Sequence, residues 1–287
     1  MRFTTYLLNG QPRLAVVTGD SAIDLASAVP GTPTDLRAAL AAGTDLAAAA
    51  AQAIASNAPR LPLASLAFAP LVPDPGKTIC LGLNYFDHAK EGGRTEKPDY
   101  PWFFYRGKTS LLGHGQPGLL PKVSGKFDYE AELAVVIGRT VPRHVAQADA
   151  LQYVFGYTCF NDMSVRDYQK RTAQWTIGKN FDGTGGFGPV LVSADELAPG
   201  ATGLRIQSRL NGQVMQDAST TDMIFSVAET IALLAECLTL EPGDAIIMGT
   251  PAGVGQARTP PVWMQAGDTI EIEIAQIGVL RNPIHAE

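Results

Sequence analysis

The stretch DYEAELAVVIG (residues 128–138) gives the strongest local indication of the fold. Its second half is apolar and rich in β-branched residues, which is typical of a buried strand. Glu130 and Glu132 are separated by one residue, so in a strand their carboxylates share one face and leave Ala131 and Leu133 on the other. Two adjacent carboxylates repel each other unless a cation lies between them. The stretch therefore predicts a strand that holds a hard divalent cation, with a solvated strand face as the alternative.

Most of the remaining chain has the same strand-like character. One segment, at 226–240, has apolar residues at helical spacing and indicates an amphipathic helix. Many strands with few helices argue against a βαβ series. We therefore expect a mostly β fold with some α. The other β-compatible segments are 77–83, 153–161, 188–194, 204–215, 244–250 and 268–274.

The first 72 residues differ from the rest. They begin with short strand-like runs joined by Asn-Gly and Gly-Asp turns. An alanine-rich segment, 35–55, follows and is helical in character, with Asp35 and Asp45 as candidate caps. Three prolines then indicate a linker. We expect a small N-terminal α+β domain over 1–72 and a second domain over 73–287.

Composition limits the possible partners. The formal net charge of −6 and a pI near 5.3 argue against nucleic acid. The three cysteines are an odd number without a CxxC pair, so we expect buried free thiols rather than disulfides or structural zinc. No apolar run is long enough to span a bilayer. The sequence predicts a cytoplasmic protein with no membrane partner.

A third carboxylate, Asp162, ends the apolar run at 153–161. Together with the first two it would complete a magnesium site, with manganese as the other candidate ion. Alternatively, Asp162 caps a helix that begins at Met163. Arg166 follows one helical turn later and is placed either to clamp a substrate carboxylate or to pair with Asp162. Gln169 falls on the same helical face.

Two loops supply further candidates. Lys179 lies in the glycine-rich loop QWTIGKNFDGTGGFGP, where a lysine beside a metal would neutralise a developing enolate. These glycines match neither a Walker loop nor a dinucleotide fingerprint, so we interpret them as turn formers. Thr250 follows an apolar strand in MGTPAGVG, and its hydroxyl is placed to bind a carboxylate or an oxyanion. A plain turn is the alternative there.

His88 and Glu91 are the acid–base candidates. They are three residues apart in LGLNYFDHAKEGG, so on a short helix they share a face. A glutamate orients an imidazole and raises its basicity. The two glycines that follow would make this segment a mobile lid. A surface helix with an incidental His–Glu pair is the alternative.

Taken together, these segments resemble the fumarylacetoacetate hydrolase (FAH) family, in its shorter bacterial-type form. The resemblance rests on GLNYFDHAKE, FDYEAELAVVIG, GYTCFNDMSVRDYQ, WTIGKNFDGTGGFGP and GDAIIMGTPAGVG, in the family's order, and covers roughly residues 73 to 287. It implies a mixed β-sandwich roll that is usually a homodimer and binds Mg²⁺ or Mn²⁺.

The resemblance also implies a role for each candidate residue. The metal carboxylates are matched by Glu130, Glu132 and Asp162, and the lid dyad by His88 and Glu91. Arg166 and Gln169 match the substrate-contacting pair of the family. Lys179 matches its active-site lysine, and Thr250 matches the threonine of its GTP turn.

Family members act on small oxo-acids, and from this resemblance we expect a C–C bond hydrolase for an acylpyruvate-like substrate. His88, oriented by Glu91, would activate water, and Arg106 or Arg166 would bind the far carboxylate. The alternative is an oxaloacetate decarboxylase or an oxo-diacid isomerase or tautomerase that uses the same metal site. A non-catalytic metal-binding module is disfavoured because every candidate residue is present. A nucleotide-binding oxidoreductase is disfavoured because its glycine fingerprint is missing.

Overall fold

The strand predicted around residue 133 lies within a large mixed sheet. A computed structural model describes residues 1–287 and places β10 (Ala131–Ile137) in an 11-stranded sheet. The strand order is β4-β3-β2-β1-β13-β11-β10-β16-β5-β6, and β7 pairs with β13 off this path. The other members are β1 (Arg2–Leu8), β2 (Gln11–Thr18), β3 (Ser21–Asp24), β4 (Leu61–Pro62), β5 (Thr78–Gly82), β6 (Trp102–Tyr105), β7 (Leu111–Leu112), β11 (Val154–Asp162), β13 (Gly185–Ser193) and β16 (Ala245–Ile247).

A second sheet packs against the first and closes the main core. It has five strands in the order β15-β14-β17-β18-β8. Leu133 and Tyr157 of the large sheet share one buried cluster with Ile206 and Ile272 of the small one. The mostly β, two-sheet architecture expected from the sequence is therefore confirmed. These strands are β8 (Gly118–Leu120), β14 (Arg205–Leu210), β15 (Gln213–Ser219), β17 (Thr269–Ile274) and β18 (Gly278–Ala286), and a separate pair is formed by β9 (Phe127–Asp128) and β12 (Ser164–Val165).

β10 is buried on both faces, which explains its nearly continuous apolar sequence. Leu133 and Val135 point into the core between the sheets. Ala134 and Val136 point into a second core on the other side. This alternation fixes the register of the strand, because a slip by one residue would exchange its two faces.

The helices are short and lie around the sheets. Two of them begin as the sequence predicted: the Asp35 carboxylate accepts from Ala38 N at 2.8 Å and the Asp45 carboxylate from Ala48 N at 2.9 Å. The long amphipathic helix is α8 (Val227–Cys237). None of the helices is long and apolar enough to cross a membrane. The others are α1 (Leu25–Ala28), α2 (Leu36–Ala41), α3 (Leu46–Ala55), α4 (Phe86–Glu91), α5 (Gln147–Ala150), α6 (Arg166–Gln169) and α7 (Thr176–Lys179).

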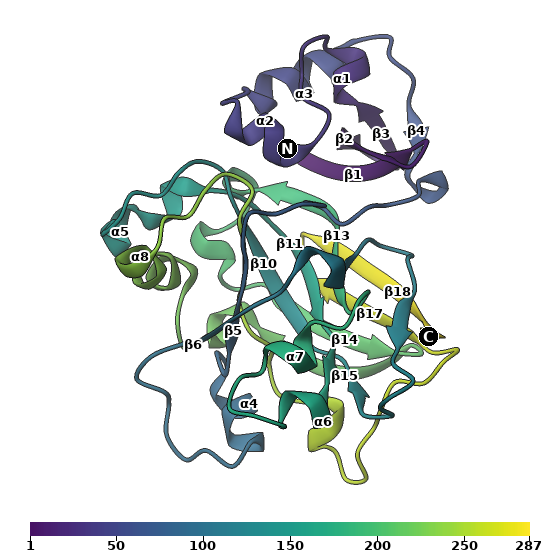
Figure 1. The fold of residues 1–287 in the computed structure, drawn as a ribbon. Coiled ribbons are helices and arrows are strands. Elements are labelled where there is room, and N and C mark those ends of the chain that lie inside the picture. The colour runs from purple at the N-terminus through teal and green to yellow at the C-terminus, as the bar shows by residue number, and fades with distance from the viewer.

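The N-terminal segment, purple in Figure 1, extends the large sheet. β1 pairs antiparallel with β13, with Phe3 opposite Leu191. Phe3 and Leu14 belong to the same buried cluster as Phe187. Both the sheet and this core therefore cross the expected boundary at residue 72, and the division into two domains stays a prediction.

One expectation about the cysteines was wrong. Cys80 and Cys159 are buried free thiols, as expected, but Cys237 is exposed. Cys237 is the last residue of α8 and lies off its buried face, which is formed by Val227, Thr230, Ile231, Leu234 and Ala235. Its apolar sequence neighbours Leu234 and Ala235 are buried.

Candidate active site

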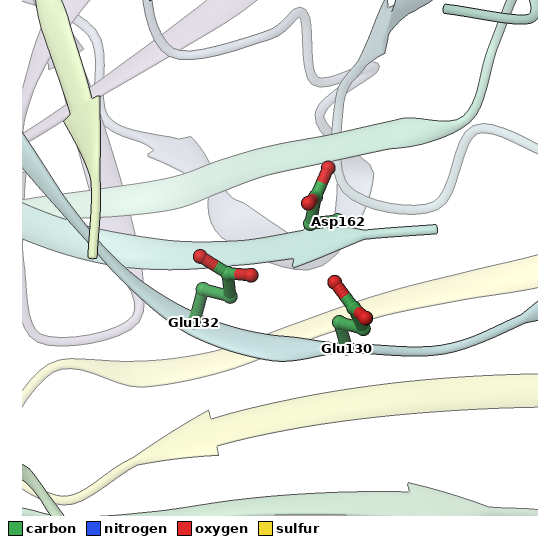
Figure 2. A group of neighbouring side chains, drawn as sticks. All are labelled: Glu130, Glu132 and Asp162. Carbon is green, nitrogen blue, oxygen red and sulfur yellow. The ribbon is translucent and has the colours of Figure 1, made fainter. Parts of the chain in front are cut away.

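Three buried carboxylates meet where β10 and β11 run side by side. Glu130 immediately precedes β10 and Glu132 lies within it, while Asp162 is the last residue of β11. Asp162 N donates to Glu130 O at 3.0 Å, which sets Asp162 beside Glu130. One oxygen from each carboxylate lies within 4.8 Å of the others (Figure 2). The strand geometry thus brings together the three residues that the sequence predicted as metal ligands.

Lys179 lies against this group. Its Nζ donates to Glu130 Oε2 and to Asp162 Oδ2, each at 2.5 Å, and the side chain is buried. Burial opposes the charged form of the lysine, but Asp162 and Glu130 outweigh it and raise its pKa. Lys179 reaches this position because α7 packs tightly on α6. The packing leaves no room for a side chain at Gly178 of α7, where a Cβ would lie 2.3 Å from the backbone N of Gln169 in α6.

Arg106 is placed differently from the prediction. Its guanidinium is buried, binds the Asp162 carboxylate through Nε and donates from Nη2 to Met163 O at 2.6 Å. It is not among the residues that line the neighbouring cavity. The Arg106 guanidinium thus lies against a metal-ligand candidate, and its contact with a substrate carboxylate stays a prediction.

Arg166 does not form the local pair with Asp162 that its spacing suggested, and its contact with a substrate carboxylate stays a prediction. Its Nε donates to Asp128 Oδ2 at 2.8 Å and its Nη1 to Gln169 Oε1 at 3.0 Å. Its Nη2 lies 2.7 Å from Glu130 Oε1, although this contact is not aligned as a hydrogen bond. The local pair with Asp162 is absent, because Asp162 is bound by Arg106 and Lys179 instead.

Asp128 is a site residue that the sequence-based prediction missed. Besides Arg166, its carboxylate accepts from Gly255 N at 2.7 Å and from Gln256 N at 3.0 Å. It therefore holds the loop after β16 against the arginine. A signal was available, because Asp128, Glu130 and Glu132 alternate in DYEAE as acidic residues that share one strand face.

The electrostatics of the carboxylates differ sharply. Burial raises the pKa of Glu132 well above its ordinary value, and the charges of Asp162 and Glu130 add to this. Glu130 is also buried, but Arg166 and Lys179 lower its pKa. Glu132 accepts one hydrogen bond, from Gly249 N at 2.6 Å. It is therefore the carboxylate that most lacks a positive partner.

This donor set fits a hard divalent cation. It consists of oxygen atoms only, which Mg²⁺ and Mn²⁺ prefer, and Glu132 has an oxygen free to coordinate. A bound ion would also relieve the repulsion between Glu132 and Asp162. The candidate ligands are Glu130, Glu132 and Asp162, as the sequence predicted.

The two acid–base candidates lie on α4 and line the same cavity as Glu130 and Glu132. His88 Nδ1 is 3.3 Å from Glu91 Oε2, which is the pairing predicted from their spacing. Glu91 Oε1 also accepts from Gly253 N at 2.8 Å. This second contact, unforeseen from the sequence, ties α4 to the loop that follows β16.

Thr250 lies on the loop that follows β16, where the side chain of Gln216 fixes its position. Gln216 Nε2 donates to Thr250 Oγ1 and to Pro251 O, both at 2.8 Å. Just before it, Gly249 adopts a φ of 86°, a conformation that other residues rarely adopt, and its N–H points at Glu132. The turn is thus built to direct polar groups toward the carboxylates.

A cavity of about 360 Å³ brings most of these groups together. Trp175 forms part of its wall and stacks on Trp102, with ring centroids 5.3 Å apart. Lys170 also lines it and was not foreseen. The predicted residues on its lining are His88, Glu91, Glu130, Glu132, Arg166, Gln169, Lys179 and Thr250.

Known proteins share this sequence and fold. The chain is 37% identical over 267 residues to rat "Oxaloacetate tautomerase Fahd2a, mitochondrial", covering 93% of this chain and 84% of that protein. It is 44% identical over 216 residues to "Oxaloacetate tautomerase YisK" of Bacillus subtilis, covering 74% and 71%. A solved maleylpyruvate hydrolase from Sphingobium sp. SYK-6, in complex with manganese(II) and pyruvate, has a TM-score of 0.82 and 31% identity and covers 100% of this chain and 99% of that chain.

The model of the fumarylacetoacetate (FAA) hydrolase C-terminal domain matches residues 77–285, which is most of the chain. That range begins just before β5, so it leaves out β1 to β4 of the large sheet, and it contains every candidate metal ligand. The chain therefore belongs to the fumarylacetoacetate hydrolase family, whose members include hydrolases, isomerases and tautomerases.

Proposed function

We propose that this protein is a metal-dependent keto–enol tautomerase that acts on oxaloacetate or a closely related 2-oxo-diacid. Two relatives at 37% and 44% identity are named oxaloacetate tautomerases. Tautomerisation requires only that one proton moves between carbon and oxygen. The catalytic groups in the cavity suffice for such a reaction, which has no leaving group.

The observation that carries the proposal is that Glu130 and Glu132 of the buried triad line the same cavity as the His88–Glu91 pair. A divalent ion on Glu130, Glu132 and Asp162, Mg²⁺ or Mn²⁺, would bind the 2-oxo-carboxylate end of the substrate and polarise its carbonyl. An acid–base group on the facing wall would then reach the adjacent carbon.

The residues of the chain take the remaining roles. His88, oriented by Glu91, removes or delivers the proton at the carbon next to the carbonyl. Lys179 places its ammonium where enolate charge develops on oxygen. Gln169 and Thr250 offer polar groups to the substrate carboxylate from the cavity wall.

A second candidate is hydrolysis of a C–C bond in an acylpyruvate-like acid. It is favoured by the fold shared with a maleylpyruvate hydrolase in complex with manganese(II) and pyruvate. The same residues would act, with His88 activating water for attack on the distal carbonyl. Pyruvate formation from an acylpyruvate separates this reaction from tautomerisation.

The experiment follows enol-oxaloacetate by its ultraviolet absorbance, with Mg²⁺, with Mn²⁺ and with a chelator. Enzyme-free samples containing the same ion give the spontaneous rate. We expect a metal-dependent acceleration that His88→Ala abolishes, with keto-oxaloacetate as the product by NMR. Acceleration equal in wild type and His88→Ala would contradict the role of His88. Release of pyruvate from acetylpyruvate, with no effect on the enol, would favour the hydrolase.

The resemblance also supports a homodimer, which light scattering after gel filtration tests. A mass of one chain, 30.4 kDa, would contradict it.

A further inference from the structure

Each buried cation of the site lies against at least one carboxylate of the protein. Arg106 binds Asp162, and Lys179 lies between Glu130 and Asp162. Arg166 faces Asp128 and Glu130. Arg106 does not line the cavity. Arg166 and Lys179 do, but each already lies against two carboxylates, although Arg166 Nη2 makes no aligned hydrogen bond. A lining cation without a carboxylate partner is therefore the better candidate for a second, distal carboxylate of a substrate.

Lys170 meets this requirement. It lines the cavity, is exposed, and has no carboxylate within 4.0 Å. It follows α6 directly, and its backbone N–H donates to Arg166 O at 3.2 Å. The turn that carries Arg166 and Gln169 thus also sets Lys170 at the cavity mouth. It is the one lining lysine or arginine without an anionic partner.

The charges of the site support the same assignment. Four buried carboxylates (Asp128, Glu130, Glu132 and Asp162) face three buried cations (Arg106, Arg166 and Lys179), which leaves one negative charge, and Glu91 on the cavity wall adds a second. A divalent ion would offset these two charges. Substrate carboxylates would then make the site negative, and a further cation at the wall would favour their binding.

We infer that Lys170 is the specificity residue that selects dicarboxylic over monocarboxylic oxo-acids by pairing with the distal carboxylate. The inference rests on the proposed function for the orientation of the substrate, with its oxo-acid end at the triad. The pair lies at the exposed mouth, so its strength falls with rising salt.

A binding experiment tests this without turnover. Malate and lactate share a 2-hydroxy-carboxylate end, and only malate has a distal carboxylate. Each is titrated calorimetrically into the Mg²⁺-loaded protein. We expect Lys170→Met to weaken malate binding by about threefold to fivefold, the upper part of the range of an exposed ion pair, and to leave lactate binding unchanged. Lys170→Arg should retain the preference for malate.

Lys126→Met is the matched control, because Lys126 is exposed and lies outside the cavity lining. It should leave both affinities unchanged. A wild-type protein that binds malate no more tightly than lactate overturns the inference, as does an equal loss for both ligands in Lys170→Met. Lys170-dependent malate selectivity in a protein without tautomerase activity supports the inference and overturns the proposed reaction.

Discussion

Glu91 Oε1 accepts a hydrogen bond from the backbone N–H of Gly253 at 2.8 Å, while Glu91 Oε2 lies 3.3 Å from His88 Nδ1. One carboxylate therefore contacts both the histidine proposed as the acid–base group and the loop that carries Thr250. Helix α4 and that loop, which both line the cavity, are thereby linked through a single side chain.

Replacing Glu91 separates these two functions. Glu91→Gln keeps an acceptor for Gly253 but loses the charge beside His88, whereas Glu91→Ala loses both. We expect kcat for enol-oxaloacetate to fall by roughly 10² in Glu91→Ala and less in Glu91→Gln, because acid–base catalysis contributes about that much or more. Steady-state kinetics with saturating Mg²⁺ measures both. Equal kcat in wild type and Glu91→Ala would remove Glu91 from the mechanism.

Glu132→Gln should abolish tight metal binding. The substitution keeps the shape of the side chain and its contact with Gly249, but removes the charge that a divalent ion needs. We expect Mn²⁺ affinity to fall by at least about 100-fold, since even outer-shell changes cost 10-fold to 100-fold. Calorimetric titration of Mn²⁺ measures this, with the exposed Glu196→Gln as the control. Unchanged Mn²⁺ affinity would place the metal elsewhere.

Lys179→Met should destabilise the protein when metal is absent. Removing this buried ammonium leaves Glu130 and Asp162 with one fewer cation, which costs about 3–5 kcal/mol when one partner of a buried pair is lost. Mg²⁺ should restore part of the loss, because the ion supplies positive charge at the same carboxylates. Urea unfolding with chelator and with Mg²⁺ tests both statements. A variant as stable as wild type in chelator would show that Lys179 does not offset the charge of these carboxylates.

Asp24 should make the stability of the N-terminal segment depend on pH in the acidic range. Burial opposes its charged form, but hydrogen bonds from Arg13 and Ser27 outweigh burial and lower its pKa from 3.8 to about 2. Its contribution is therefore complete above pH 4 and is lost as the pH falls toward 2. We expect Asp24→Asn to cost about 2 kcal/mol at pH 7 and less at pH 2.

Urea unfolding of wild type and Asp24→Asn at a series of pH values provides the measurement. Asp20→Asn serves as the control, because Asp20 lies exposed in a turn. A difference between wild type and Asp24→Asn that stays constant from pH 7 to pH 2 would show that the Asp24 charge contributes nothing.

The sequence by itself determined the elements and the chemical inventory of this protein. An apolar run rich in β-branched residues predicted β10, Asp35 and Asp45 predicted two helix starts, and the one-residue spacing predicted the shared face of Glu130 and Glu132. These features are local, because they depend on periods of two or 3.6 residues and on hydrogen bonds to nearby backbone. For that reason they could be predicted without the fold.

Only the tertiary structure decided which charges pair. Arg106 reaches Asp162 across 56 positions of sequence, and Asp128 reaches Gly255 across 127. The N-terminal strands join the main sheet through β1 and β13, which no composition change along the chain could reveal. Such contacts depend on the packing of distant strands rather than on spacing. The same packing leaves Lys170 without a carboxylate partner at the cavity mouth, while Arg166 nearby is buried against Asp128 and Glu130.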